Sequence, residues 1–115
     1  DIFNPKTIRA TMGSIFRVPF VYVPDLAPVL EQMHAKGIYT YAAHLKGQEY
    51  YDSFSFREPT AFLIGNEGNG LSKEISDQAG QYLKIPMEGR VESLNASIAA
   101  ALLMYEAHRQ RSARL

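Results

Sequence analysis

The sequence contains no cysteine, no long apolar run and no net charge, and each absence excludes a class of protein. Without cysteine there is no disulfide framework and no thiolate chemistry, which is compatible with the cytoplasm. The longest apolar run, residues 98–105, is too short to span a bilayer, and no signal peptide opens the chain, so we expect no membrane. Twelve basic and twelve acidic residues cancel, so net charge alone favours neither nucleic acid nor a membrane surface. The histidines at positions 34, 44 and 108 are too scattered to predict a metal site.

The 115 residues, 46% of them hydrophobic, are enough for one small domain with a core of its own. The chain opens DIFNPK, without a methionine and without a first strand. We therefore expect a piece of a longer protein.

Helical and strand patterns alternate along the chain. We expect helices at residues 5–17 (capped by Asn4), 24–37 (capped by Asp25 and stopped by Gly37), 71–80 (capped by Ser72) and 93–111. Strands are expected at residues 20–23, 38–43, 60–65 and 81–87. The alternation predicts an α/β fold with a parallel sheet flanked by helices on both faces.

Two polar, glycine-containing loops follow strands of this sheet. IGNEGNG (residues 64–70) leaves one strand and IPMEGRVES (residues 85–93) leaves another. In open parallel sheets ligands bind beyond the carboxyl ends of the strands. The two loops therefore predict a single binding site at that edge.

The first loop fits neither of the common phosphate-binding patterns. A P-loop needs Lys after its last glycine, where this chain has Leu71, and the dinucleotide fingerprint needs a third glycine where it has Lys73. Glu67 would repel a polyphosphate but would tolerate a cationic ligand. A plain turn from strand to helix is the alternative interpretation.

The second loop leads into a helix of small residues. Ser93, Leu94 and Asn95 stand directly before Ala96, Ser97 and the alanines that follow. Either Ser93 or Asn95 could simply cap this helix. The strand end Ile85-Pro86-Met87 together with SLN is a more specific combination than a cap requires.

The two segments FLIGNEGNGLS and IPMEGRVESLNASIAAALLMYE resemble motifs two and three of the SpoU branch of the SPOUT methyltransferases, and PKTIRATMGSIFRVPF resembles the segment between motifs one and two. The resemblance implies a deep trefoil knot in the C-terminal part of the fold. It also implies S-adenosylmethionine as cofactor and methyl transfer to a ribose 2′-hydroxyl of RNA, with ribosomal RNA favoured over transfer RNA. A homodimer is implied as well.

The resemblance assigns roles to individual positions. The cofactor would be held by backbone groups of Gly65, Ile85 and Leu94, with Asn66 and Met87 lining the same pocket. The reaction centre would be shaped by Glu67, Ser93 and Asn95. Arg9 and Arg17 are candidates for contacts with RNA phosphates.

Motif one, with the arginine that the family is expected to use on the hydroxyl, has no counterpart here. We therefore expect a fold lacking its first strand and helix, most of the cofactor pocket, and little or no activity of the fragment alone. Two alternatives stay open. One is a knotted RNA- or protein-binding module that has lost catalysis. The other is an unrelated α/β domain that binds a nucleotide through IGNEGNG.

Overall fold

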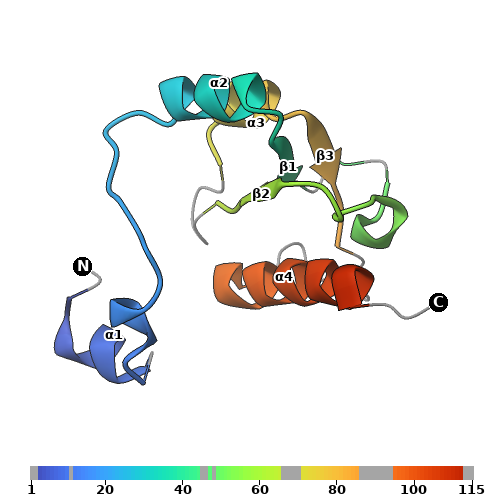
Figure 1. Cartoon of the computed structure of the whole chain (residues 1–115). Helices are drawn as coiled ribbons and strands as arrows, with labels where there is room; N and C mark the ends of the chain where they lie inside the picture. Colours follow the sequence, from blue (N-terminus) through green and yellow to red (C-terminus); the bar gives the residue numbers. More distant parts are fainter. Residues whose placement is uncertain are drawn as a thin grey trace.

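The chain begins with an arm that lies apart from the sheet (Figure 1). The computed structural model describes residues 3–10, 12–44, 47, 49–65, 71–85 and 95–112. Helix α1 (Pro5–Ala10) opens with Asn4 Oδ1 accepting a hydrogen bond from the Lys6 N–H at 2.9 Å, as the sequence predicts. The single helix expected to run to residue 17 is interrupted. Met12 and Gly13 both have positive φ, +52° and +87°, and a short 3-10 turn, η1 (Ser14–Phe16), follows. Two consecutive left-handed residues cannot continue a right-handed helix.

The strand expected at residues 20–23 is wrong. These residues form an irregular connection, and Val21 is 80% exposed. The ring of Phe20 contacts those of Phe3 and Tyr22, with centroids 5.8 and 6.0 Å apart. β-branched and aromatic residues favour strands only where a neighbouring strand and a half-buried surface receive them, and in the described chain this segment pairs with no strand.

Helix α2 (Ala27–Ala35) follows the arm and fits its predicted position. The N-cap is Leu26 and not the predicted Asp25, whose Oδ1 nevertheless accepts from the Ala27 N–H at 3.1 Å. Leu30 is the buried residue of this helix, and Gly37 ends the turn after the helix with φ +78°. Glycine adopts this left-handed conformation without the steric cost that a Cβ would add.

The sheet of the described residues is parallel and has three strands rather than the expected four. Strands β1 (Tyr39–Ala43), β2 (Thr60–Leu63) and β3 (Gln81–Leu83) lie in the order β2-β1-β3. The central strand therefore runs between the two that precede the polar loops. The register places Ala42 opposite Leu63 and Ala43 opposite Leu83.

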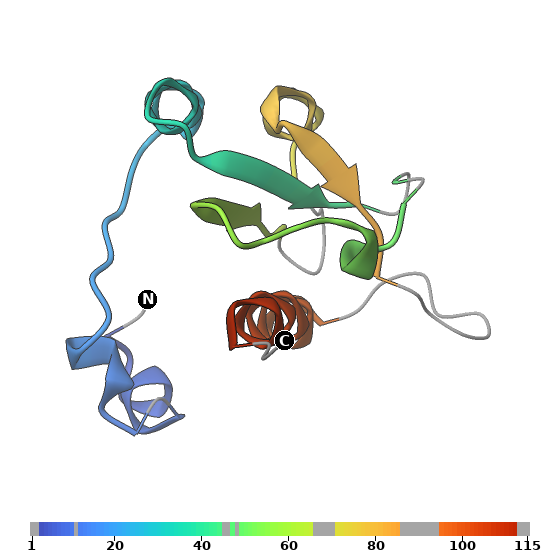
Figure 2. The same cartoon turned by 45° about the vertical axis from the view of Figure 1, so that its right-hand side comes forward.

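Helices cover both faces of this sheet, as Figure 2 shows. Helices α2 and α3 (Lys73–Gln78) pack on one face, where Leu30 of α2 joins Ala42 and Leu63 of the sheet in a buried cluster. Ser72 caps α3 as predicted, its Oγ accepting from the Ile75 N–H at 3.2 Å. The other face carries the longest helix, α4 (Ala96–Ser112), over a second core whose buried members are Tyr41, Phe56, Leu83, Leu103 and Ala107.

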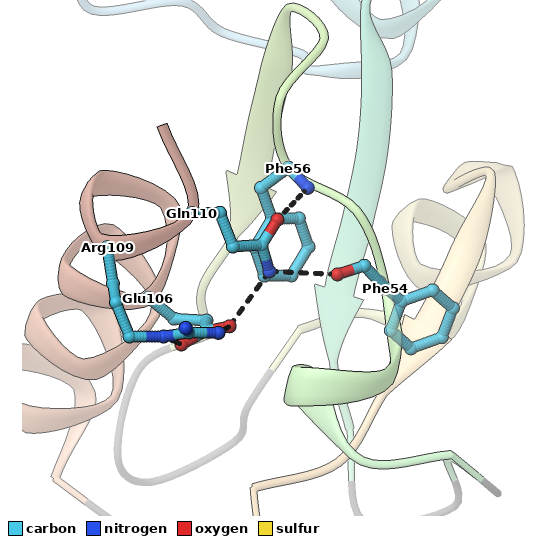
Figure 3. A network of polar contacts seen from close by, with 5 residues as sticks. All are labelled: Phe54, Phe56, Glu106, Arg109 and Gln110. Carbon is cyan, nitrogen blue, oxygen red and sulfur yellow. Dashed lines mark hydrogen bonds and ion pairs between the residues drawn. The ribbon is translucent and has the colours of Figure 1, made fainter. Parts of the chain in front are cut away.

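The C-terminal half of α4 holds the connection between β1 and β2, which contains a 3-10 turn, η2 (Tyr51–Ser53). Figure 3 shows the contact: the Gln110 side-chain amide accepts from the Phe56 N–H at 2.6 Å and donates to the Phe54 carbonyl at 2.9 Å. Next to it, the Arg111 guanidinium donates to the carbonyl oxygens of Phe56 and Glu58 at 2.8 and 2.9 Å. These side-chain contacts bind a stretch of backbone that belongs to no strand, so they fix the helix against the sheet.

Candidate functional site

The carboxyl ends of all three strands meet at one edge of the sheet. Beyond the last paired positions of β1 and β2, the register continues from Ala42 and Leu63 to His44 and Gly65. The ladder to β3 also extends past the strand, because the His44 N–H donates to the Leu83 carbonyl at 3.0 Å. Gly65, His44 and Ile85 therefore stand at the ends of three adjacent strands. The predicted meeting of the two loop-bearing strands at one edge is confirmed at Gly65 and Ile85.

Gly65 and Ile85 are both half-buried. The side chain of Ile85 packs against the core under α4, so its backbone is fixed where the strand ends. Gly65 has no side chain to obstruct an approaching molecule. Residues at strand ends with small or inward-packed side chains leave backbone N–H and C=O groups as the recognition elements of such an edge.

Asn95 stands at the start of α4 and caps it. Its Oδ1 accepts hydrogen bonds from the Ser97 and Ile98 N–H groups at 2.8 and 3.3 Å. The capping interpretation is thus confirmed for this residue, and its side-chain oxygen satisfies N–H groups of the first helical turn.

The direction of α4 places Asn95 near the candidate edge. Arg111, at the other end of the helix, binds carbonyl oxygens just before β2 begins. A cavity between the two elements has Ile64 and Ala100 among its lining residues as well as Thr60 and Arg111. The helix therefore runs antiparallel to β2, and its first turn faces the carboxyl ends of the strands.

Five predicted site residues lie outside the described residues: Asn66, Glu67, Met87, Ser93 and Leu94. Their roles remain predictions. Arg9 and Arg17 are exposed on the N-terminal arm, where Arg9 Nε donates to the Pro5 carbonyl at 3.4 Å. The arm lies apart from the strand ends in Figure 1, so the structure does not bring these arginines together with Gly65, Ile85 and Asn95.

The sequence prediction overlooked His44 and its neighbours at this edge. The His44 ring lies against that of Tyr82, with centroids 5.2 Å apart and planes inclined by 38°. The Tyr82 hydroxyl donates to Asp77 Oδ1 at 2.5 Å, and this hydrogen bond raises the pKa of the tyrosine. The one available signal was position, since His44 directly follows the strand that the alternating pattern placed at residues 38–43.

Gly47 allows the chain leaving β1 to approach β3 closely. A Cβ added at this position would lie 3.0 Å from the Leu83 carbonyl carbon and 3.2 Å from its oxygen. After Gly47 the chain pairs with the outer side of β3, where Tyr50 forms a parallel bridge with Lys84. The connection thus crosses from the middle of the sheet to its far side next to the candidate site.

The same cavity between β2 and α4 has a volume of about 470 Å³. It is lined by Thr60, Phe62, Ile64, Ala100, Met104, Ala107, His108 and Arg111. Within the described sheet β2 is an edge strand, so the cavity opens beside a strand whose outer side has no described neighbour. Across the described ranges we find no cluster of three or more potential metal ligands and no helix of the length and apolarity that crossing a membrane requires.

The fold and the edge together define a class: a parallel α/β domain whose candidate ligand site lies at the carboxyl ends of the strands, near the first turn of a helix. Comparison with known proteins identifies the family within this class. The model of the SpoU rRNA Methylase family matches residues 1–105. The chain belongs to this family.

Individual relatives support the same family assignment. The chain is 38% identical over 104 residues to the putative TrmH family tRNA/rRNA methyltransferase YacO of Bacillus subtilis, covering 90% of this chain and 42% of that protein. It matches the SpoU methyltransferase AviRb of Streptomyces viridochromogenes in complex with S-adenosylmethionine at a TM-score of 0.88 and 38% identity, over 99% of this chain and 45% of AviRb. An RNA 2′-O ribose methyltransferase structure matches at a TM-score of 0.85 and 32% identity, over 96% of this chain and 43% of that one.

The chain therefore spans less than half the length of these relatives. What the comparisons establish for the described residues is the family and the parallel α/β fold.

Proposed function

We propose that this chain carries the cofactor-binding part of an RNA methyltransferase that transfers the methyl group of S-adenosylmethionine to a ribose 2′-hydroxyl. The observation that carries the proposal is the meeting of Gly65, Ile85 and the capped start of α4 at the carboxyl edge of the sheet. A second support is AviRb, which holds S-adenosylmethionine and superposes on nearly the whole of this chain.

The residues at this edge fit such a cofactor. Gly65 lies two residues past Leu63, the last residue of β2 that pairs with β1, and the glycine lets a ligand approach its backbone. The Ile85 side chain packs inward, so its peptide groups can hold the adenine and ribose by hydrogen bonds. Backbone recognition adds no side-chain charge to a site that must accept a sulfonium cation.

The proposed pocket continues into the two loops. Leu94 supplies a third backbone contact, and Asn66 and Met87 line the pocket. Glu67, Ser93 and Asn95 shape the reaction centre. Glu67 places a carboxylate where a cationic methyl donor is tolerated and a polyphosphate is not.

When bound, the cofactor supplies the reactive methyl group. The protein has to hold the ribose hydroxyl in line with that group and to exclude water, and positioning accounts for a large part of such a rate. The cap at Asn95 serves this purpose by fixing the first turn of α4. A base or a cation that stabilises the ionised hydroxyl supplies the rest.

The arginine expected for that last task belongs to motif one, which we place in an upstream segment of the parent protein. We propose that the upstream segment also adds a strand beside β2, where the sheet edge and the 470 Å³ cavity offer room. On this proposal the 115-residue chain binds cofactor but methylates little or no RNA by itself.

Three further features belong to the same proposal. The chain after β3 passes through a loop to form a trefoil knot, two copies pair as a homodimer, and the substrate is ribosomal RNA in preference to transfer RNA. The name of the family, SpoU rRNA Methylase, supports ribosomal RNA as the substrate. The relative YacO is a putative tRNA/rRNA methyltransferase, so its name does not distinguish the two kinds of RNA. Arg9 and Arg17 are the proposed contacts to RNA phosphates.

Calorimetry with S-adenosylhomocysteine tests the cofactor site directly. We expect micromolar binding by the chain, its loss in Gly65→Trp, which fills the pocket, and no change in Gln32→Trp on the exposed side of α2. Equal binding by all three proteins would place the ligand elsewhere and contradict the proposal.

Methyl transfer is then measured with the upstream segment restored. Activity gained with that segment supports the proposal that this chain binds the cofactor and that the upstream segment completes the catalytic site. Cofactor binding without any methyl transfer to RNA would favour a module that has lost catalysis.

A further inference from the structure

The strand order gives the central strand a place in the site that the two motif loops alone do not reveal. Neighbouring strands lie about 4.8 Å apart, so the ends of β2 and β3 are separated by about 10 Å with the end of β1 between them. A ligand that contacts the backbone of both Gly65 and Ile85 has to cross the end of β1. This step rests on the proposed cofactor site.

The side chains at the end of β1 differ in size and face. Ala43 packs toward the core under α4 and is small. Side chains alternate along a strand, so His44 lies on the same face as Ala42, toward α3. His44 is therefore the large, planar side chain at the centre of the edge.

Two contacts hold His44, one on its backbone and one on its ring. Its backbone N–H is bonded to the Leu83 carbonyl at 3.0 Å, which holds the main chain in the ladder. Its imidazole lies against Tyr82, whose hydroxyl is in turn bonded to Asp77 at 2.5 Å. A ring that packs on a second, hydrogen-bonded ring and extends from a fixed main chain loses less conformational entropy when it holds a ligand.

We propose that His44 is a cofactor-contacting residue, and that its imidazole stacks on the adenine of the adenosyl group held between Gly65 and Ile85. Adenine presents a planar π-face, and stacking on an aromatic side chain is a common way for proteins to bind a base. The tilted contact with Tyr82 supports the imidazole from behind. The contact is to the adenosyl part of the cofactor and not to its amino acid part.

Two ligands and three variants test this proposal by calorimetry on the full-length protein. S-adenosylhomocysteine contains both parts of the cofactor, and methylthioadenosine contains the adenosyl part without the amino acid. We expect His44→Gln, which removes the aromatic ring, to weaken the binding of both ligands by about tenfold. His44→Phe, which keeps a stacking surface, should stay within about threefold of the wild type.

His108→Ala is the matched control. His108 also lies against a tyrosine, with its ring centroid 6.5 Å from that of Tyr105, but on α4. It should bind both ligands as the wild type does, and thermal unfolding of each variant checks that the fold is retained.

The outcomes separate the two levels of the proposal. A wild type that binds neither ligand contradicts the proposed function. A wild type that binds both, with His44→Gln equal to it, overturns the role of His44 and leaves the proposed function intact. Weakening of S-adenosylhomocysteine alone, or equal weakening by Gln and Phe, overturns the stacking contact with adenine.

Discussion

The side-chain amide of Gln110 binds the extended chain before β2 in the way that a residue of a parallel strand would. In a parallel ladder one residue donates to the carbonyl before its partner and accepts from the N–H after it. Gln110 does both around Ser55, with bonds to the Phe54 carbonyl and the Phe56 N–H. Its Nε2 also donates to Glu106 Oε2 at 2.8 Å (Figure 3).

Gln110→Ala removes all of these bonds at once. The Phe56 side chain is completely buried, and an N–H left without a partner in such surroundings costs about 1–3 kcal/mol. Loss of the bond to the Phe54 carbonyl adds about 1 kcal/mol. Alanine returns about 0.5 kcal/mol through its higher helix propensity. The expected loss is therefore about 1.5–3.5 kcal/mol, or roughly 10 °C in Tm for a chain of this size.

Urea and thermal unfolding followed by circular dichroism measure the effect. The control is Gln32→Ala on the exposed side of α2, which should change the free energy of unfolding by less than about 0.5 kcal/mol. Gln110→Glu is a sharper variant, because a carboxylate cannot donate to the Phe54 carbonyl and is repelled by Glu106. It should be less stable than Gln110→Ala at pH 7. If Gln110→Ala unfolds within 0.5 kcal/mol of the wild type, the amide does not hold α4 to the sheet.

Three further predictions concern the charge network, the edge and the buried threonine. Hydrogen bonds from Arg109, at 2.7 and 2.8 Å, lower the pKa of Glu106 from 4.5 to about 2 against the opposing effect of burial. The stabilisation is therefore present above pH 4.5 and lost as the pH falls through 2. Because solvent screens the exposed arginine, this stabilisation amounts to about 1–2 kcal/mol. Glu106→Gln should flatten this part of a curve of unfolding free energy against pH. Gly47→Ala should destabilise the protein by about 1–3 kcal/mol and weaken the binding of S-adenosylhomocysteine, because the added Cβ would press on the Leu83 backbone. Unchanged unfolding and binding would contradict the close approach of the chain to β3 at Gly47. Thr40→Val should cost about 2 kcal/mol in urea unfolding, because the buried Thr40 Oγ1 accepts from the Gly80 N–H at 2.8 Å, whereas Thr40→Ser should recover most of it.

Patterns that depend on local chemistry were predicted well. Asn4 and Ser72 cap helices as their positions indicate, because a side-chain oxygen next to orphan N–H groups acts within a few residues. Asp25 lies one residue before the observed N-cap of α2, Leu26, and still accepts from the first helical N–H. The strands that became β1, β2 and β3 were found from their apolar, β-rich composition. The segment at residues 20–23 has the same composition, but a strand also needs a partner, which local sequence does not supply.

The candidate site divides in the same way. Glycine, asparagine and the strand-end isoleucine were visible as motif residues, since the chemistry of a backbone-lined pocket selects those residue types. His44 was not, because its importance depends on the order of the strands, which is a long-range property. The Gln110 contact was equally hidden, since it joins residues more than fifty positions apart.

The sequence by itself therefore determined the family, the parallel α/β class, the helix caps and the two strand ends that lead into the motif loops. These depend on residue identity and on spacings of a few positions. Only the tertiary structure decided that β1 lies between those two strand ends, that the chain crosses β3 at Gly47, and that α4 is held by its C-terminal half. Each of these depends on which distant segments gain the most by burying apolar surface together while pairing their backbone groups, and no local pattern encodes that balance.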